Sequence, residues 1–171
     1  MKFVRSLVLV AALAALSACS APEERAPTPA AWEEPSMYRS LARSDAEIDA
    51  EAARAMISQY RRNHGLSDLA LDPDLQRIAQ EQARDAGRQP KFDAKANALK
   101  ERLAANKVNA HSTVANISAG YHTLAEAFSG WRQSAPHNAH MLEPRARRMG
   151  IATAYEPGAK YHVFWVLILA E

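Results

Sequence analysis

Two histidines, preceded by a serine, are the residues in this sequence best suited to chemistry. Ser134, His137 and His140 fall within seven residues, and side chains three positions apart share one face of a helical turn. Imidazoles at this spacing can bind zinc or another transition metal, with Glu143 or His111 as a further ligand. The alternative is a hydrogen-bonded His137 at the edge of a cavity, beside a solvated or packed His140. We favour the alternative and expect no metal and no other cofactor.

Ser134 could act as a nucleophile only beside a histidine and an orienting carboxylate. His137 follows three residues later, yet no acidic residue is spaced to complete a triad, and no serine has Gly-x-Ser-x-Gly surroundings. Glu126 is better explained as the third helical residue of a capping box opened by Thr123 than as a general base. Hydrolysis is therefore the less favoured hypothesis.

Charge balance and cysteine content exclude several classes of protein. The chain has 171 residues, enough for one domain, with 21 Lys and Arg against 19 Asp and Glu. Lys2 and Arg5 fall in a segment predicted to be removed, which leaves 19 of each sign and no basic face for nucleic acid. The single cysteine, Cys19, excludes an intramolecular disulfide and a multi-cysteine metal site.

The N-terminus has the features of an export signal. Residues 1–18 combine a short positive start with an apolar run too short to span a bilayer. The sequence Leu16-Ser17-Ala18-Cys19 resembles the bacterial lipobox, which implies a lipoprotein whose first mature residue, Cys19, carries diacylglycerol and a further acyl chain such as palmitate. Ser20 stands where an aspartate is associated with inner-membrane retention. We therefore expect a cell-envelope protein anchored in the outer membrane and facing the periplasm.

Residues 19–44 are predicted to be the lipidated cysteine and a tether. Between residues 20 and 44 lie four of the nine prolines and no glycine, a composition typical of stiff linkers. Met37, Tyr38 and Leu41 could instead pack against the domain, which we place at residues 45–171.

Hydrophobic periodicity predicts helices in the first part of this domain. One helix is expected to be capped at Ser44 and to stop before Gly65, and a second to begin at Asp72-Pro73 and end at Gly87. A weaker helix is expected over residues 94–106, and another begins at Thr123.

The C-terminal part changes to strands. A short strand is expected over residues 113–117, and a hairpin is expected from residues 149–155 and 161–170. Because residues 163–169 are apolar at every position, both faces of the last strand should be covered, which makes it central. Helices followed by a C-terminal antiparallel hairpin indicate an α+β fold with helices packed on an antiparallel sheet.

Four phrases occur in an order that resembles a known family: residues 62–72, 115–120, 131–137 and 149–152. The chain resembles the bacterial SCP-like branch of the CAP superfamily, named for cysteine-rich secretory proteins, antigen 5 and pathogenesis-related proteins, from about residue 46 onward. The resemblance implies an α-β-α sandwich with a surface cavity.

The residues of that cavity carry over only in part. Complete members use two histidines and acidic residues, including the glutamate of a Glu-Asn-Ile motif, whereas this chain has Ala115 before Asn116 and no histidine near residue 92. His137 matches the second histidine, and Trp131 and Ser134 match as well. With His140, which its spacing from His137 adds, the cavity or ligand candidates are Trp131, Ser134, Asn116, His137 and His140.

Two hypotheses follow for the function. The first is a membrane-anchored binding or scaffold module for a small apolar or amphipathic ligand, or for an envelope partner such as a protein or peptidoglycan. The alternative is a metal-dependent or histidine-based envelope hydrolase using His137 and His140. The incomplete cavity residues favour the first.

Overall fold

The computed structural model describes residues 33–89, 97–108 and 113–171. The predicted export signal, Cys19, the tether up to residue 32 and His111 lie outside the described residues. From Glu33 onward the chain is one compact unit.

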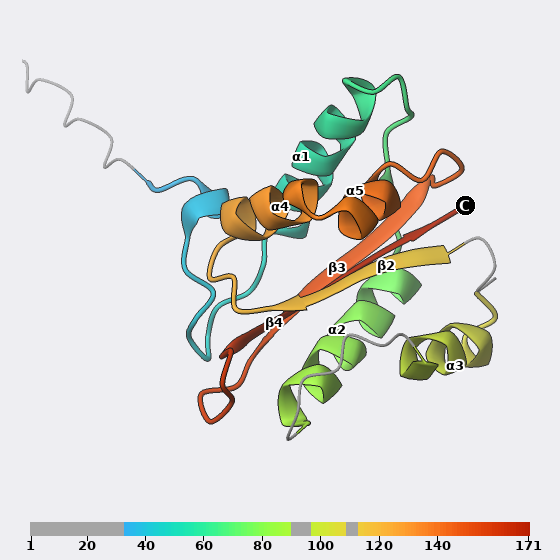
Figure 1. The fold of residues 1–171 in the computed structure, drawn as a ribbon. Helices are drawn as coiled ribbons and strands as arrows, with labels where there is room; N and C mark the ends of the chain where they lie inside the picture. The colour runs from blue at the N-terminus through green and yellow to red at the C-terminus, as the bar shows by residue number, and fades with distance from the viewer. Residues whose placement is uncertain (1–32, 90–96, 109–112) are drawn as a thin grey trace, which may run out of the picture. The chain divides into compact units, whose positions relative to one another are not determined.

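A four-stranded sheet forms the centre of this unit (Figure 1). Its strands are β1 (Ala70–Leu71), β2 (Thr113–Ala119), β3 (Arg148–Tyr155) and β4 (Val163–Ala170), in the order β1-β3-β4-β2. β4 pairs antiparallel with both β2 and β3, so the prediction of a central last strand is confirmed. The expected purely antiparallel sheet is wrong, because β1 runs parallel to β3. Two residues are too few to leave a periodic signal in the sequence.

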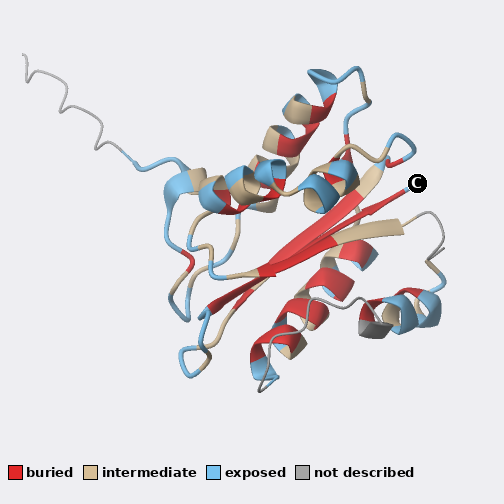
Figure 2. Ribbon diagram, viewed as in Figure 1, coloured by how far each residue is buried: buried red, intermediate tan, exposed pale blue. Residues whose placement is uncertain are grey.

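Helices cover both faces of the sheet (Figure 1). One face carries α1 (Ala50–Arg62), α4 (Leu124–Gln133) and α5 (Ala135–Met141), and the other carries α2 (Pro73–Arg88) and α3 (Asn97–Ala105). Side chains alternate along β4: Leu167 belongs to the cluster under α1 and α4, and Val166 to the cluster under α2 and α3. Every residue of β4 is buried (Figure 2). The α-β-α sandwich of the α+β class is therefore confirmed.

Two helix starts lie where the sequence predicts them. The Asp72 carboxylate accepts hydrogen bonds from the backbone N–H groups of Asp74 and Leu75, and Pro73 is the first residue of α2. Thr123 and Glu126 form the expected capping box at α4. Glu126 thus has the structural role that the sequence assigns to it.

Two other helix boundaries differ from the prediction. α1 begins at Ala50, where Asp49 accepts from the N–H of Ala52, and Ser44 is not its cap. Gly87 does not end α2, which continues to Arg88. A Cβ at Gly87 would lie 2.6 Å from Cγ of Glu156, so this glycine allows a close approach rather than a helix stop.

The segment before α1 packs on the domain. Ser36–Tyr38 form a short 3₁₀ helix, η1, and Met37 packs against the core. Leu41 is buried, and its N–H donates to the carbonyl of His122 at 2.7 Å. The compact unit therefore starts before the predicted boundary at residue 45, in keeping with the alternative that the sequence leaves open for these residues.

Candidate functional site

A buried asparagine brings the two histidines together. Asn116 is fully buried on β2, and its Nδ2 donates to the backbone carbonyl of His137 at 3.0 Å. Its Oδ1 lies 3.0 Å from Nδ1 of His140. With the amide oriented in this way, Nδ1–H of His140 is the donor, so Nε2 of the neutral ring carries the lone pair. Three of the five candidates thus form one connected cluster.

His137 lies half-buried on α5, one helical turn before His140. Burial and, secondarily, the nearby His140 lower the pKa of His137 from its ordinary value of 6.5. Among the described residues, no carboxylate forms a hydrogen bond or ion pair with either imidazole. The surroundings therefore favour the neutral imidazole of His137 near pH 7.

The lowered pKa of His137 predicts a pH-dependent stability. As the pH falls below 6.5, the unfolded chain binds the proton before the folded chain does, so the free energy of unfolding should decrease until the pH passes the folded pKa. We expect the variant His137→Asn to lose less stability than the wild type between about pH 7.5 and 5.5 in urea titrations. The exposed His122→Asn should retain the wild-type pH profile, and identical profiles for all three proteins would contradict this origin.

Among the described residues, the side chains of Ser134 and Trp131 form no hydrogen bond with Asn116, His137 or His140. Ser134 separates α4 from α5, and within the described part of the chain its hydroxyl has no hydrogen-bond partner. Trp131 is fully buried, donates from Nε1 to Oγ of Ser118 at 3.0 Å, and contacts Trp165 edge to face. Trp131 therefore links α4 to β2 inside the core.

Ala115 does not line the site formed by Asn116, His137 and His140. Its methyl group packs with the hydrophobic side chains under α2 and α3, whereas Asn116, the next residue on β2, faces α5. Alternate residues of a strand point to opposite faces. A carboxylate at position 115 would therefore face α2 and α3 and not His137.

His137 and His140 have no third metal-ligating side chain beside them among the described residues. In the ranges that the structure describes, no three His, Cys, Asp or Glu side chains lie together as a metal site. Glu143, a predicted further ligand, instead accepts from Arg145.

A buried arginine holds the turn that follows α5. Arg61 of α1 is fully buried, and burial lowers the pKa of its guanidinium. It donates hydrogen bonds of 2.9–3.0 Å to four backbone carbonyls, those of Ser67, Met141, Glu143 and Ala146. Arg61 thus joins α1 to both flanking loops and helps to fix α5, which carries the histidines.

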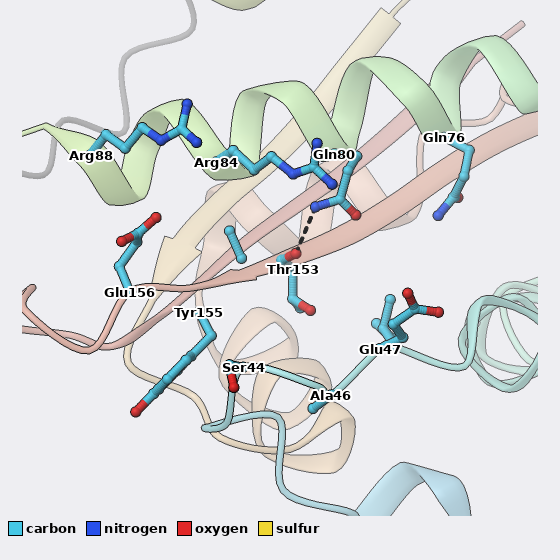
Figure 3. Close-up of a pocket in the computed structure, with 12 residues that line it drawn as sticks. Ser44, Ala46, Glu47, Gln76, Gln80, Arg84, Arg88, Thr153, Tyr155 and Glu156 are labelled. Atoms are coloured by element: carbon cyan, nitrogen blue, oxygen red, sulfur yellow. Dashed lines mark hydrogen bonds between the residues drawn. The ribbon is translucent and has the colours of Figure 1, made fainter.

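A second feature, which the sequence interpretation missed, is a pocket of about 420 Å³ beside the free edge of β3 (Figure 3). α2 forms one wall and residues 44–48 another. None of the five candidates lines it. The signal was present, because four long polar side chains recur every fourth residue of α2: Gln76, Gln80, Arg84 and Arg88.

Comparisons with known proteins agree with this architecture. Residues 54–169 match the model of the cysteine-rich secretory protein family, CAP. An extracellular SCP-domain protein of Bacillus anthracis is 21% identical, with a TM-score of 0.59 over 71% of this chain and 39% of that chain. A cysteine-rich secretory protein of Staphylococcus aureus is 20% identical, with a TM-score of 0.58 over 71% and 38%.

The chain spans about two fifths of those two proteins. It covers 97% of an outer surface protein of Borrelia burgdorferi, which is 17% identical with a TM-score of 0.58 over 74% of this chain. No curated protein matches the sequence. The structural likenesses show a shared fold, and the family match extends over more than half of the chain. The chain belongs to the CAP family of cysteine-rich secretory proteins.

Proposed function

We propose that this chain is a lipid-anchored envelope protein whose CAP domain binds a ligand or an envelope partner without cleaving it. The observation that carries this proposal is the position of Asn116. Its amide orients His140 where a serine hydrolase would use a carboxylate, and the CAP domain has no cysteine to act as the nucleophile of a Cys-His-Asn site. An amide fixes the tautomer but has no negative charge to stabilise an imidazolium, so proton transfer through His140 gains little.

The ligand follows from the same cluster. His137 and His140 can hydrogen-bond a polar group of a ligand, and the core beside them is apolar. A small amphipathic molecule, or the equivalent part of an envelope protein or peptidoglycan, meets both conditions.

Anchoring is supported by the sequence before the domain. Cys19 ends a short apolar export segment and is the single cysteine of the chain. In the described part of the chain, no helix is long and apolar enough to cross a membrane. The relatives named for extracellular and outer-surface locations are in keeping with an envelope position facing the periplasm.

Replacing Cys19 by alanine should release the protein from the membrane. Without the thiol no diacylglycerol can be attached, and the hold of several acyl chains, at about 0.8 kcal/mol per buried methylene, is lost. We expect the wild type in the outer-membrane fraction and Cys19→Ala in the soluble envelope fraction. Ser20→Ala is the matched control and should fractionate like the wild type, and equal fractionation of the cysteine variant would contradict lipid anchoring.

Catalysis is tested by peptidase and esterase screening of the detergent-extracted protein, with and without added zinc. We expect equal turnover, at background level, for the wild type, His137→Ala and His140→Ala. Mass spectrometry of the same extract should identify a co-purified amphipathic molecule whose occupancy decreases in both variants. Turnover above background that is lost only in the histidine variants would replace this proposal with the hydrolase hypothesis.

A further inference from the structure

The free edge of β3 is partly closed by side chains from α2. β1 pairs only with Arg148 and Met149, so on the side away from β4 the rest of β3 has no strand beside it among the described residues. Gln76 takes the place of a strand at Ile151: its Nε2 donates to the carbonyl at 2.5 Å, and its Oε1 accepts from the N–H at 3.0 Å. One turn later, Nε2 of Gln80 donates to the carbonyl of Thr153 at 3.0 Å (Figure 3).

The repeats of the helix and the strand coincide along this edge. Four residues of an α-helix rise by about 6 Å, and two residues of a strand by about 6.6 Å. Gln76 therefore matches Ile151, Gln80 matches Thr153, and the next helical position, Arg84, matches Tyr155. In an antiparallel pair only alternate residues hydrogen-bond to the partner strand, and the N–H and carbonyl of Ile151 bond to Gln76. The backbone groups of residues 153 and 155 therefore also point away from β4.

The row of glutamines along the pocket ends at Gln80, and Arg84 follows it. A guanidinium has no acceptor, so Arg84 cannot serve the outward N–H of Tyr155 as a glutamine could. Among the described residues, no hydrogen bond reaches the outward N–H of Thr153 or the N–H and carbonyl of Tyr155. The last step of the strand edge is thus open to a ligand that has both backbone donors and acceptors.

The same part of the strand edge lies beside two arginines that have no partner among the described residues. Arg84 and Arg88 are exposed and extend from α2 along the pocket (Figure 3). Neither forms an ion pair or hydrogen bond with a described residue, whereas Arg77 on the same helix pairs with both Asp74 and Glu81. Glu47 and Glu156 also line the pocket, yet neither lies within ion-pair distance of Arg84 or Arg88. The guanidinium donors remain available to carboxylates.

We propose that this pocket binds an extended acidic peptide segment. The peptide adds a short strand to β3 at residues 153–155, and its carboxylates bind Arg84 and Arg88. A volume of about 420 Å³ suits a few residues of a peptide and lies in the range of ordinary ligand pockets. The site lies apart from Asn116 and the histidines, so this inference does not depend on the proposed function.

The test measures fluorescence anisotropy of the labelled peptide Val-Glu-Val-Glu-Val, capped at both ends, with the full chain in detergent. We expect this peptide to bind more tightly than the same peptide with glutamine in place of glutamate. Arg84→Met and Arg88→Met should each weaken binding by about tenfold, because each removes charge-assisted hydrogen bonds without adding an amide that could bond the strand edge. Arg145→Met, which removes an exposed arginine outside the pocket, should bind like the wild type.

Two further arms separate a peptide site from a simple anion site. N-methylation of the central peptide residues should abolish binding if strand pairing contributes, and inorganic phosphate should compete only weakly. Glu156→Gln should tighten binding by about two- to threefold, since it removes a carboxylate that repels the peptide. Equal binding of the acidic and glutamine peptides, unchanged binding in both arginine variants, or binding that is insensitive to N-methylation would each overturn the proposal.

Discussion

Replacing Arg61 by methionine is expected to lower the free energy of unfolding by about 3–5 kcal/mol. The guanidinium is fully buried and satisfies four backbone carbonyls in two loops. Methionine fills a similar volume but donates no hydrogen bond, so these carbonyls would lose their partner inside the protein. Urea unfolding at neutral pH measures the loss as a lower midpoint.

Arg62→Met is the matched control at the next position. Arg62 is exposed and pairs with Asp68 at the surface, so its removal should cost less than about 1 kcal/mol. Arg61→Lys should also be destabilising, because three ammonium donors on a single atom cannot reach four carbonyls spread over two loops. A midpoint for Arg61→Met as high as that of Arg62→Met would show that water replaces the guanidinium at little cost.

The sequence predicts best those parts of the fold that local interactions determine. The caps at Asp72 and Thr123 involve residues at most three positions apart, and both are present. The central position of β4 follows from its continuous apolar run. The cap at Ser44 fails because Asp49 takes that role, while the preceding segment packs on the core through Ala46 and Ile48. That packing depends on residues distant in the sequence.

The candidate site is predicted only where its residues are neighbours in the chain. His137 and His140 share a helical turn, as expected from their spacing. Their link to Asn116 joins residues 21 and 24 positions apart and depends on which face of β2 meets α5. Nothing local marks Arg61 as buried, because its charge is satisfied by carbonyls from other segments. Side-chain contacts of this kind require the tertiary structure.

A lysine in place of Val166 is expected to destabilise the domain by several kcal/mol, about 4 or more. Val166 is fully buried in the middle of β4, between Ala152 on β3 and Ile117 on β2. It packs in the cluster under α2 and α3, whose other members are apolar side chains. Thermal unfolding should show a large decrease in Tm.

Val166→Ala separates the effect of charge from that of lost volume. It removes two methyl groups without adding a polar atom, so it should cost about 1–3 kcal/mol. Burial lowers the pKa of an inserted lysine, so the excess cost of Val166→Lys over Val166→Ala should shrink as the pH rises and level off above the ordinary lysine pKa of about 10.4, where the unfolded chain also loses the proton. A lysine variant as stable as the alanine variant at pH 7 would mean that this side chain reaches water, and β4 could then not lie between two helical layers.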